Sequence, residues 1–223
     1  MSVEVSGLRI SVRRGTPDLA VALEALGGEF EVFRQYFDPA FDGVVVDAGG
    51  HIGSTAIAIA KMFPRAQIIS IEPEAENFDL LRANTRLYPN IHPINKALTS
   101  QGGKTLAVID RGTGSWGFSV VSNPKGAVSS TDQQVETISL EELSEYGPIS
   151  ILKLDIEGGE LDLFQNSTHL LEEIDLIFVE LHDKVIDGCS EAFHHFSSAR
   201  ETYRSDGEKW VSFRPKDEPA RTS

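Results

Sequence analysis

A run of three valines followed by a glycine-rich segment constrains the fold of this chain more than any other feature. Val44–Val46 is short, apolar and β-branched, a composition that predicts a buried strand. Residues 47–53 then read Asp-Ala-Gly-Gly-His-Ile-Gly, and glycines at this point indicate a strand-to-helix turn. Because glycine has no Cβ, such a turn lets the backbone approach a ligand closely. The segment therefore predicts an α/β fold with a ligand at this turn.

Strand and helix patterns alternate along most of the chain, whose 223 residues suit one large α/β domain. The expected strands are 44–48, 67–71, 91–97, 149–154 and 176–181, and the expected helices are 17–26, 54–63, 76–87, 140–146, 161–171 and 191–200. This alternation predicts a parallel sheet with helices on both faces. Residues 100–136 interrupt it, and we expect an antiparallel excursion or a long loop there. An Asp-Gly pair at 206–207 predicts a hairpin.

The composition excludes several kinds of partner. A net charge of −14, from 20 basic and 34 acidic side chains, argues against nucleic acid, because its phosphates would be repelled. The single cysteine, Cys189, excludes an internal disulfide and fits a reducing compartment. We expect no signal peptide, and no apolar run reaches the roughly 20 residues of a membrane span. A soluble, cytoplasmic protein without a membrane partner is therefore expected, and a homo-oligomer is left open.

Acidic residues follow the expected strands at the sheet edge where ligands of open α/β sheets bind. They are Asp47, Glu72, Asp155, Glu157, Glu160 and Glu180. A dinucleotide fingerprint, Gly-x-Gly-x-x-Gly, is not matched, because Ala48 stands at its first glycine. Asp47 would also repel a pyrophosphate at the helix N-terminus. S-adenosylmethionine, which has a ribose and a sulfonium but no phosphate, fits these residues better than a dinucleotide.

The expected roles in binding S-adenosylmethionine follow from position. Asp47, Gly49 and Gly53 are expected to hold its methionine part, with Gly49 allowing close backbone approach. Glu72, at the end of the second strand, is expected to accept hydrogen bonds from the ribose hydroxyls. A side chain near Asn95 and Ala97 is expected to lie at the edge of the adenine, although Asn95 is equally suited to closing a turn. Asp155, after the fourth strand, is also expected to contact the cofactor.

Three segments resemble the FkbM family of S-adenosylmethionine-dependent methyltransferases. Residues 47–55 are similar to the family's Asp-x-Gly-x-x-x-Gly loop. Residues 71–74 read Ile-Glu-Pro-Glu, with Asn77 and Asn84 downstream. Residues 152–160 read Leu-Lys-Leu-Asp-Ile-Glu-Gly-Gly-Glu and resemble the family's Lys-x-Asp-x-Glu-Gly-x-Glu signature, the most specific of the three. The resemblance covers about residues 15–185.

The resemblance implies a fold, an activity and a domain organisation. The fold is a Rossmann-like class I methyltransferase fold, α/β, with a mostly parallel seven-stranded sheet, one antiparallel strand and helices on both faces. The implied reaction is methyl transfer to a hydroxyl of a small-molecule acceptor, a sugar or a polyketide-type natural product. We accordingly expect an N-terminal strand and helix extension over 1–42, the methyltransferase domain over 43–215 and a flexible tail over 216–223.

The candidate catalytic residues are Asp155, Glu157 and His182, because a hydroxyl is a weak acid and needs a base. His182 has the ordinary pKa best suited to that task, yet it is equally suited to a structural role at the sheet end. Asp155 is alternatively a helix-capping acid. Asp155, Glu180 and His182 also offer ligands to a divalent ion such as magnesium, but without a strict spacing, so no residue is assigned to a metal.

Two other functions remain open from the sequence. A nucleotide-dependent oxidoreductase can use a similar sheet, and Asp47 is the residue that argues against it. A non-catalytic S-adenosylmethionine-binding protein would keep the glycine turn and Glu72 but would not need Asp155 or His182.

Overall fold

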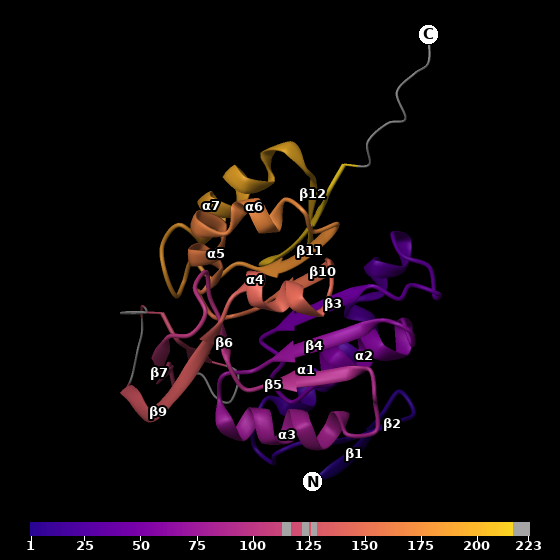
Figure 1. Ribbon diagram of the computed structural model, residues 1–223. Coiled ribbons are helices and arrows are strands. Elements are labelled where there is room, and N and C mark those ends of the chain that lie inside the picture. Colours follow the sequence, from indigo (N-terminus) through magenta and orange to yellow (C-terminus); the bar gives the residue numbers. More distant parts are fainter. Residues whose placement is uncertain (113–116, 122–124, 126–128, 216–223) are drawn as a thin grey trace.

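The computed structural model describes residues 1–112, 117–121, 125 and 129–215 (Figure 1). The tail expected over 216–223 lies outside these residues. Within the described part of the chain, no helix is long and apolar enough to cross a membrane.

A seven-stranded sheet forms the centre of the molecule, with the strand order β12-β13-β11-β10-β3-β4-β5. Its strands are β3 (Val44–Ala48), β4 (Gln67–Ile71), β5 (Ile91–Ile94), β10 (Ile149–Leu154), β11 (Leu176–Glu180), β12 (Glu201–Asp206) and β13 (Lys209–Phe213). The five strands from β5 to β11 pair in parallel, whereas β13 is antiparallel to both of its neighbours. The predicted mostly parallel sheet with one antiparallel strand is therefore confirmed, as is the hairpin at 206–207.

Side chains along the central strands alternate between two hydrophobic cores, one on each face of the sheet. In β3, Val45 belongs to one core and Val44 and Val46 to the other. The first core is covered by α2 (Ser54–Met62) and the N-terminal segment. The second is covered by α4 (Leu140–Leu143), α5 (Glu160–Asn166), α6 (Thr168–Leu171) and α7 (Cys189–Phe196). Helices thus cover both faces, as expected for parallel strands that are buried on each side (Figure 1).

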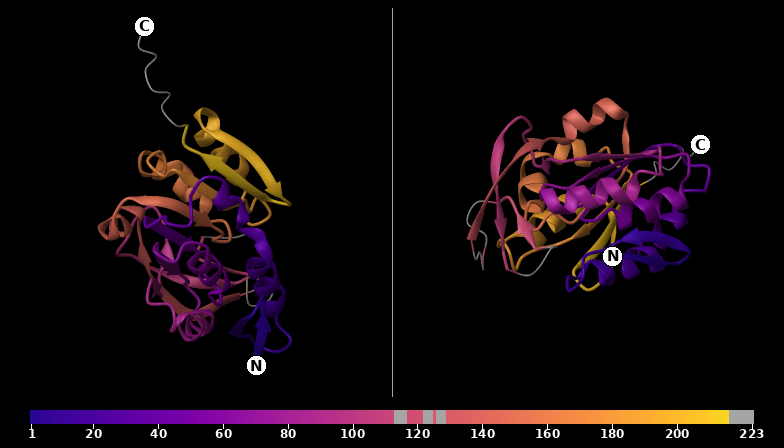
Figure 2. Two further views of the ribbon diagram at one scale, coloured as in Figure 1. Left: turned by 90° about the vertical axis from the view of Figure 1, so that its right-hand side faces the viewer. Right: turned by 90° about the horizontal axis from the view of Figure 1, so that it is seen from below.

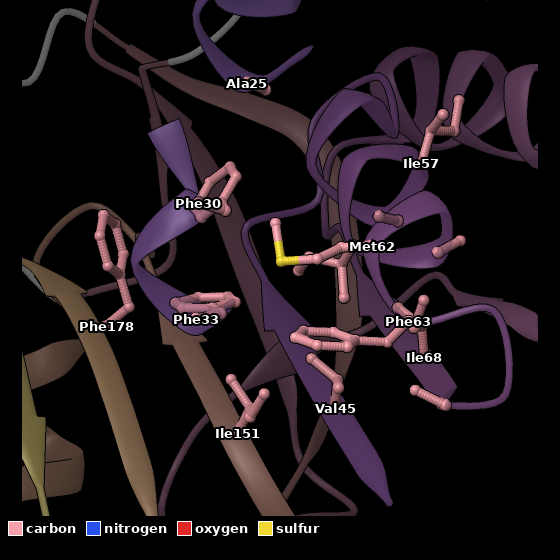
Figure 3. Close-up of a cluster of buried hydrophobic side chains, with 14 of the residues drawn as sticks. Ala25, Phe30, Phe33, Val45, Ile57, Met62, Phe63, Ile68, Ile151 and Phe178 are labelled. Atoms are coloured by element: carbon pink, nitrogen blue, oxygen red, sulfur yellow. The ribbon is translucent and has the colours of Figure 1, made fainter. Parts of the chain in front are cut away.

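The N-terminal segment packs along the outside of the first core (Figure 2). It contains the hairpin of β1 (Ser2–Val5) and β2 (Leu8–Ser11), helix α1 (Asp18–Glu24), and the short turns η1 (Ala25–Glu29) and η2 (Glu31–Gln35). Phe30 and Phe33 are almost fully buried and lie 5.3 and 5.9 Å, between ring centroids, from Phe178 of β11 (Figure 3). These edge contacts join the segment to the sheet.

The interruption at 100–136 is an antiparallel excursion, one of the two predicted alternatives. It forms a second sheet with the order β6-β9-β7-β8, made of β6 (Ala97–Leu98), β7 (Thr105–Asp110), β8 (Phe118–Ser119) and β9 (Ser129–Ile138). The excursion lies on the side to which the arrows of β4 and β5 point (Figure 1). It therefore stands beside the carboxyl ends of the parallel strands.

Two of the predicted elements are interrupted in the structure. The strand expected over 91–97 is wrong at its end: β5 stops at Ile94 and Ala97 begins β6 of the other sheet. The break occurs because Asn95 Nδ2 donates hydrogen bonds to the carbonyl oxygens of Glu72 and Pro73, which turns the chain. The helix expected over 161–171 is divided into α5 and α6 at Ser167, whose backbone leaves the helical region. Neither boundary shows in hydrophobic periodicity.

We predict that Phe33→Ala lowers the free energy of unfolding by about 3–5 kcal/mol, because it leaves a cavity beside Phe30 and Phe178. Denaturant unfolding followed by circular dichroism measures this loss. The control Leu87→Ala, at a side chain that is 77% exposed, is expected to change stability by less than about 0.5 kcal/mol. Equal effects of the two substitutions would contradict the role given to the aromatic contact.

Candidate functional site

A cavity of about 300 Å³ opens at the carboxyl ends of β3, β4, β10 and β11, next to the excursion. Among the residues that the sequence singled out, Gly49, Glu72, Ala97, Asp155, Glu157, Glu180 and His182 line it. Asp47, Gly53, Asn95 and Glu160 do not. Most of the residues expected at the strand ends thus lie in one place, and the other four support the cavity from behind.

The glycine turn is held by its own backbone. The amides of Gly49 and Gly50 both donate to the carbonyl oxygen of Ile71, at 3.0 and 2.9 Å, which joins the turn to the end of β4. Gly49 has φ +80°, and a Cβ there would lie 1.8 Å from the carbonyl oxygen of Asp155. Glycine is therefore required at this position by contact between two turns, in addition to its place on the cavity wall.

Lys153 is a buried cation behind the glycine turn, and the sequence analysis gave it no role. Its Nζ lies 3.5 Å from Oδ1 of Asp47 and 3.4 Å from Oδ2 of Asp155, and it donates to the carbonyl oxygens of Ala48 and Gly49. Burial lowers the pKa of Lys153, but the charges of Asp155 and Asp47 outweigh burial and raise it above its usual value. The signal that was available is a charged residue, Lys153, within a mostly apolar strand, Ile149–Leu154.

Asp47 faces away from the cavity. Its side chain is fully buried, accepts a hydrogen bond of 2.7 Å from Ser70 Oγ, and lies against Lys153. Burial raises the pKa of Asp47, while Lys153 and Ser70 oppose that rise. Asp47 therefore acts on the glycine turn by fixing Lys153, which in turn holds two carbonyl oxygens of the turn.

Glu72 presents a buried carboxylate to the cavity. Its Oε2 accepts a hydrogen bond from the amide of His51 at 2.8 Å, and its Oε1 accepts from the amide of Glu74 at 3.0 Å and from Asn77 Nδ2 at 3.2 Å. Burial raises the pKa of Glu72, and these donors and His51 oppose the rise. Each carboxylate oxygen is held by an N–H donor, which fixes the plane of the group.

His182 is oriented by a buried acid. Its Nδ1 lies 3.1 Å from Oε1 of Glu160, a fully buried residue whose carboxylate also accepts from the amides of Ile156 and Gly158. Its Nε2 lies 3.6 Å from Oδ1 of Asp155. Burial lowers the pKa of His182, but Glu160, Asp155 and Glu157 together raise it to about 10. At neutral pH this imidazole is a cation and a hydrogen-bond donor, which differs from the base expected from its ordinary pKa.

The same charges act in the opposite sense on Asp155. Burial raises the pKa of Asp155, but Lys153 and His182 outweigh it, so the pKa lies below its usual value. Its side chain is 37% exposed and faces the cavity. Asp155 is thus an anion between two cations, and it does not serve as a side-chain cap in the described structure.

Glu157 combines a strained backbone with a raised pKa. It has φ +53°, a conformation that a residue with a side chain rarely adopts and that is frequent at functional sites. The conformation is held from the excursion, because Ser119 Oγ donates to the carbonyl oxygen of Glu157 and Arg111 contacts its carboxylate. Burial raises the pKa of Glu157 to about 7, against the opposing charge of His182.

The described residues give no support to the magnesium alternative. They contain no group of three or more His, Cys, Asp or Glu side chains arranged to hold a metal ion. Both ring nitrogens of His182 face carboxylates, Glu160 on one side and Asp155 on the other.

The fold of the chain is similar to that of solved methyltransferase structures. It is similar to precorrin-6y C5,15-methyltransferase from Geobacter metallireducens GS-15, with a TM-score of 0.50 at 10% identity over 92% of this chain and 93% of that one. It is similar to the N-terminal domain of human METTL16 in complex with SAH, with a TM-score of 0.50 at 11% identity over 94% and 77%. The chain has the Rossmann-like fold of class I methyltransferases, as expected.

The family follows from the sequence. The profile described as the methyltransferase FkbM domain matches residues 47–216, more than half of the chain, and the chain therefore belongs to the FkbM methyltransferase family. It is 28% identical over 188 residues to the hexuronic acid methyltransferase AglP of Haloferax volcanii, covering 82% of this chain and 74% of that protein. It is 25% identical over 200 residues to the 2-O-methyltransferase NoeI of Sinorhizobium fredii, covering 80% of each. The chain is a methyltransferase, and the oxidoreductase alternative has no support.

We predict that Gly49→Ala lowers the free energy of unfolding by more than about 3 kcal/mol, because the new methyl group would overlap the backbone of Asp155. Gly15→Ala is the matched control: Gly15 has φ +75°, but a Cβ there would meet no described atom within 4 Å. That control is expected to lose only the about 1–2 kcal/mol due to the left-handed backbone. Equal losses in thermal unfolding would contradict the contact between the two turns.

Proposed function

We propose that this protein is an S-adenosylmethionine-dependent O-methyltransferase that acts on a hydroxyl of a small-molecule acceptor, a sugar or a polyketide-type natural product. The observation that carries the proposal is one cavity lined by Gly49 and Glu72 together with Asp155, Glu157 and His182. The printed activities of the relatives, a hexuronic acid methyltransferase and a 2-O-methyltransferase, support the acceptor class. The SAH complex of METTL16, a protein of the same fold, supports the cofactor.

The residues at the Glu72 side of the cavity fit the cofactor. Glu72 is only 5% exposed and faces the cavity. Its Oε1 already accepts two hydrogen bonds and its Oε2 accepts one, so the remaining lone pair of Oε2 suits a ribose hydroxyl. Ala97 and Leu98 add an apolar wall that suits the adenine. Gly49 leaves room for the methionine part, while Asp47 acts through Lys153 and Gly53 through its left-handed turn before α2. Asn95 keeps Glu72 in place by closing the turn after β4.

The other side of the cavity suits the acceptor. It is lined by Val21 and Phe30 of the N-terminal segment, by Phe118 and Val120 of the excursion, and by Lys209 of β13. Lys209 lies 2.7 Å from the carboxylate of Glu24 and also contacts Glu29. Apolar rings and hydrogen-bonding groups together match the faces and hydroxyls of a sugar or a polyketide-type ring.

The bound cofactor supplies an electrophilic methyl group, so the protein must position the acceptor hydroxyl and remove its proton. Glu157 is the base in this proposal, because its pKa of about 7 leaves about half of it ionised at neutral pH and makes the carboxylate more basic than usual. The His182 cation is oriented by Glu160, and its Nε2 lies 3.6 Å from Asp155 and 4.0 Å from Glu157, so its charge attracts both carboxylates. Asp155 accepts a hydrogen bond from the acceptor and orients its hydroxyl.

We predict that the protein binds S-adenosylhomocysteine in isothermal titration calorimetry and that Glu72→Ala weakens this binding at least about tenfold, because a hydrogen bond to a charged group is lost. The control Glu145→Ala removes an exposed carboxylate and is expected to bind as the wild type does. Absence of binding by the wild type at high micromolar ligand would overturn the proposed cofactor.

We predict that kcat/KM rises tenfold per pH unit below about pH 7 and reaches a plateau above it. Glu157 is protonated below its pKa of about 7 and cannot accept the proton, whereas it is ionised above that pKa. Transfer of a labelled methyl group to a compound in a cell extract, followed by mass spectrometry, measures the rate. A rise centred near pH 10 would instead assign the base to His182, whose pKa is about 10.

Glu157→Gln is expected to reduce kcat by about 100-fold or more while S-adenosylhomocysteine still binds. If this variant and a His182→Ala variant both bind the cofactor and retain full transfer, the catalytic assignment fails. If no methylated product forms with the wild type although it binds the cofactor, the protein is a non-catalytic binder.

A further inference from the structure

A buried ion pair lies in the N-terminal segment, ahead of the region matched by the family profile. Asp18 is fully buried at the start of α1, and Arg13 follows β2. The backbone amide and Nε of Arg13 donate to Oδ2 of Asp18 at 2.9 and 3.0 Å, and Nη2 donates to Oδ1 at 3.0 Å. This bidentate arrangement fixes the orientation of the guanidinium relative to the carboxylate. Neither residue lines the cavity.

Arg13 determines the orientation of Asn77. Its Nη2 donates to Oδ1 of Asn77 at 2.6 Å, and Asn77 Nδ2 donates to Oε1 of Glu72 at 3.2 Å. A guanidinium has only hydrogen-bond donors, so the amide nitrogen of Asn77, which is also a donor, cannot face it. The amide oxygen must therefore face Arg13, and the amide nitrogen must face Glu72.

Asp18 determines the conformation of His51 in a similar way. Oδ1 of Asp18 lies 3.3 Å from Nε2 of His51, and Nη2 of Arg13 lies 3.4 Å from the same nitrogen. His51 has φ +46°, and this left-handed backbone directs its amide to Oε2 of Glu72 at 2.8 Å. A non-glycine residue keeps such a backbone conformation only where neighbouring groups restrain it. The contact with Asp18 restrains the side chain of His51.

We propose that Arg13 and Asp18 are positioning residues for Glu72, which they fix through Asn77 and His51. One donor to each oxygen of Glu72 is thereby oriented from the N-terminal segment, and the remaining lone pair of Oε2 is left for a ligand in the cavity. Groups behind a binding residue commonly set its orientation in this manner. The inference rests on the proposed binding of a ribose by Glu72, and it extends the cofactor site to residues outside the region matched by the family profile.

A double-mutant cycle tests the proposal on the full-length protein, with S-adenosylhomocysteine as the probe in isothermal titration calorimetry. Arg13→Met removes the guanidinium at similar length and is expected to weaken binding about tenfold. Glu72→Gln is expected to weaken binding at least as much. Because Arg13 acts through Glu72, the double variant is expected to bind within about twofold of Glu72→Gln alone. A purely structural role of Arg13 would instead multiply the two losses.

Two further variants separate positioning from folding. Arg14→Met removes the neighbouring exposed arginine and is expected to bind as the wild type does. Asn77→Leu keeps the Arg13–Asp18 pair and removes the amide between Arg13 and Glu72. Asn77 also lines the cavity, so this variant is expected to lose at least as much binding as Arg13→Met. Thermal unfolding of every variant shows whether it is folded at the temperature of the titration. If Arg13→Met is unfolded there, Asn77→Leu takes its place in the double-mutant cycle.

The outcomes distinguish this inference from the proposed function. No binding by the wild type overturns both. Binding by the wild type that Glu72→Gln leaves unchanged overturns the ribose role of Glu72 and the inference that depends on it. The positioning role alone is overturned in two cases, both with binding weakened by Glu72→Gln. In the first, the losses of Arg13→Met and Glu72→Gln multiply in the double variant. In the second, Arg13→Met and Asn77→Leu both bind as the wild type does.

Discussion

The buried contact of Lys153 with two carboxylates is the interaction on which the site depends. Lys153 belongs to β10, Asp47 to the neighbouring β3, and Asp155 to the turn after β10. The cation also holds the carbonyl oxygens that open the glycine turn. Removal of a single partner from such a buried group leaves an uncompensated charge, so the three residues form one unit. The separation between the glycine turn and Asp155 is fixed by that unit.

Most of the fold could be predicted from the sequence because the strands are short apolar runs separated by helical patterns. The buried valines of β3 and the acids after each strand place the ligand edge of the sheet without further information. Boundaries at Ile94 and Ser167 could not be predicted, since each depends on tertiary contacts or local backbone geometry instead of periodicity. The excursion was expected only as one of two alternatives, because pairing between β7 and β9 leaves a weak local signal.

The residues of the site could be located from the sequence, but their protonation could not. An ordinary pKa suggested His182 as the base, and three neighbouring carboxylates make it a cation. Glu157 acquires its pKa of about 7 from burial, which a sequence does not show. Arg13 and Asp18 were not singled out at all, because their contacts with His51 and Asn77 join segments 33 or more positions apart in the chain.

The attachment of Glu157 to the excursion has a consequence for how the acceptor preference of this protein can change. Ser119 and Arg111 belong to the same excursion that supplies Phe118 and Val120 to the proposed acceptor wall. A change of this excursion that admits a differently shaped acceptor also displaces the groups that set the strain and the acidity of Glu157. Acceptor choice and the pH range of activity are therefore expected to evolve together, whereas the half of the cavity around Glu72 can stay constant.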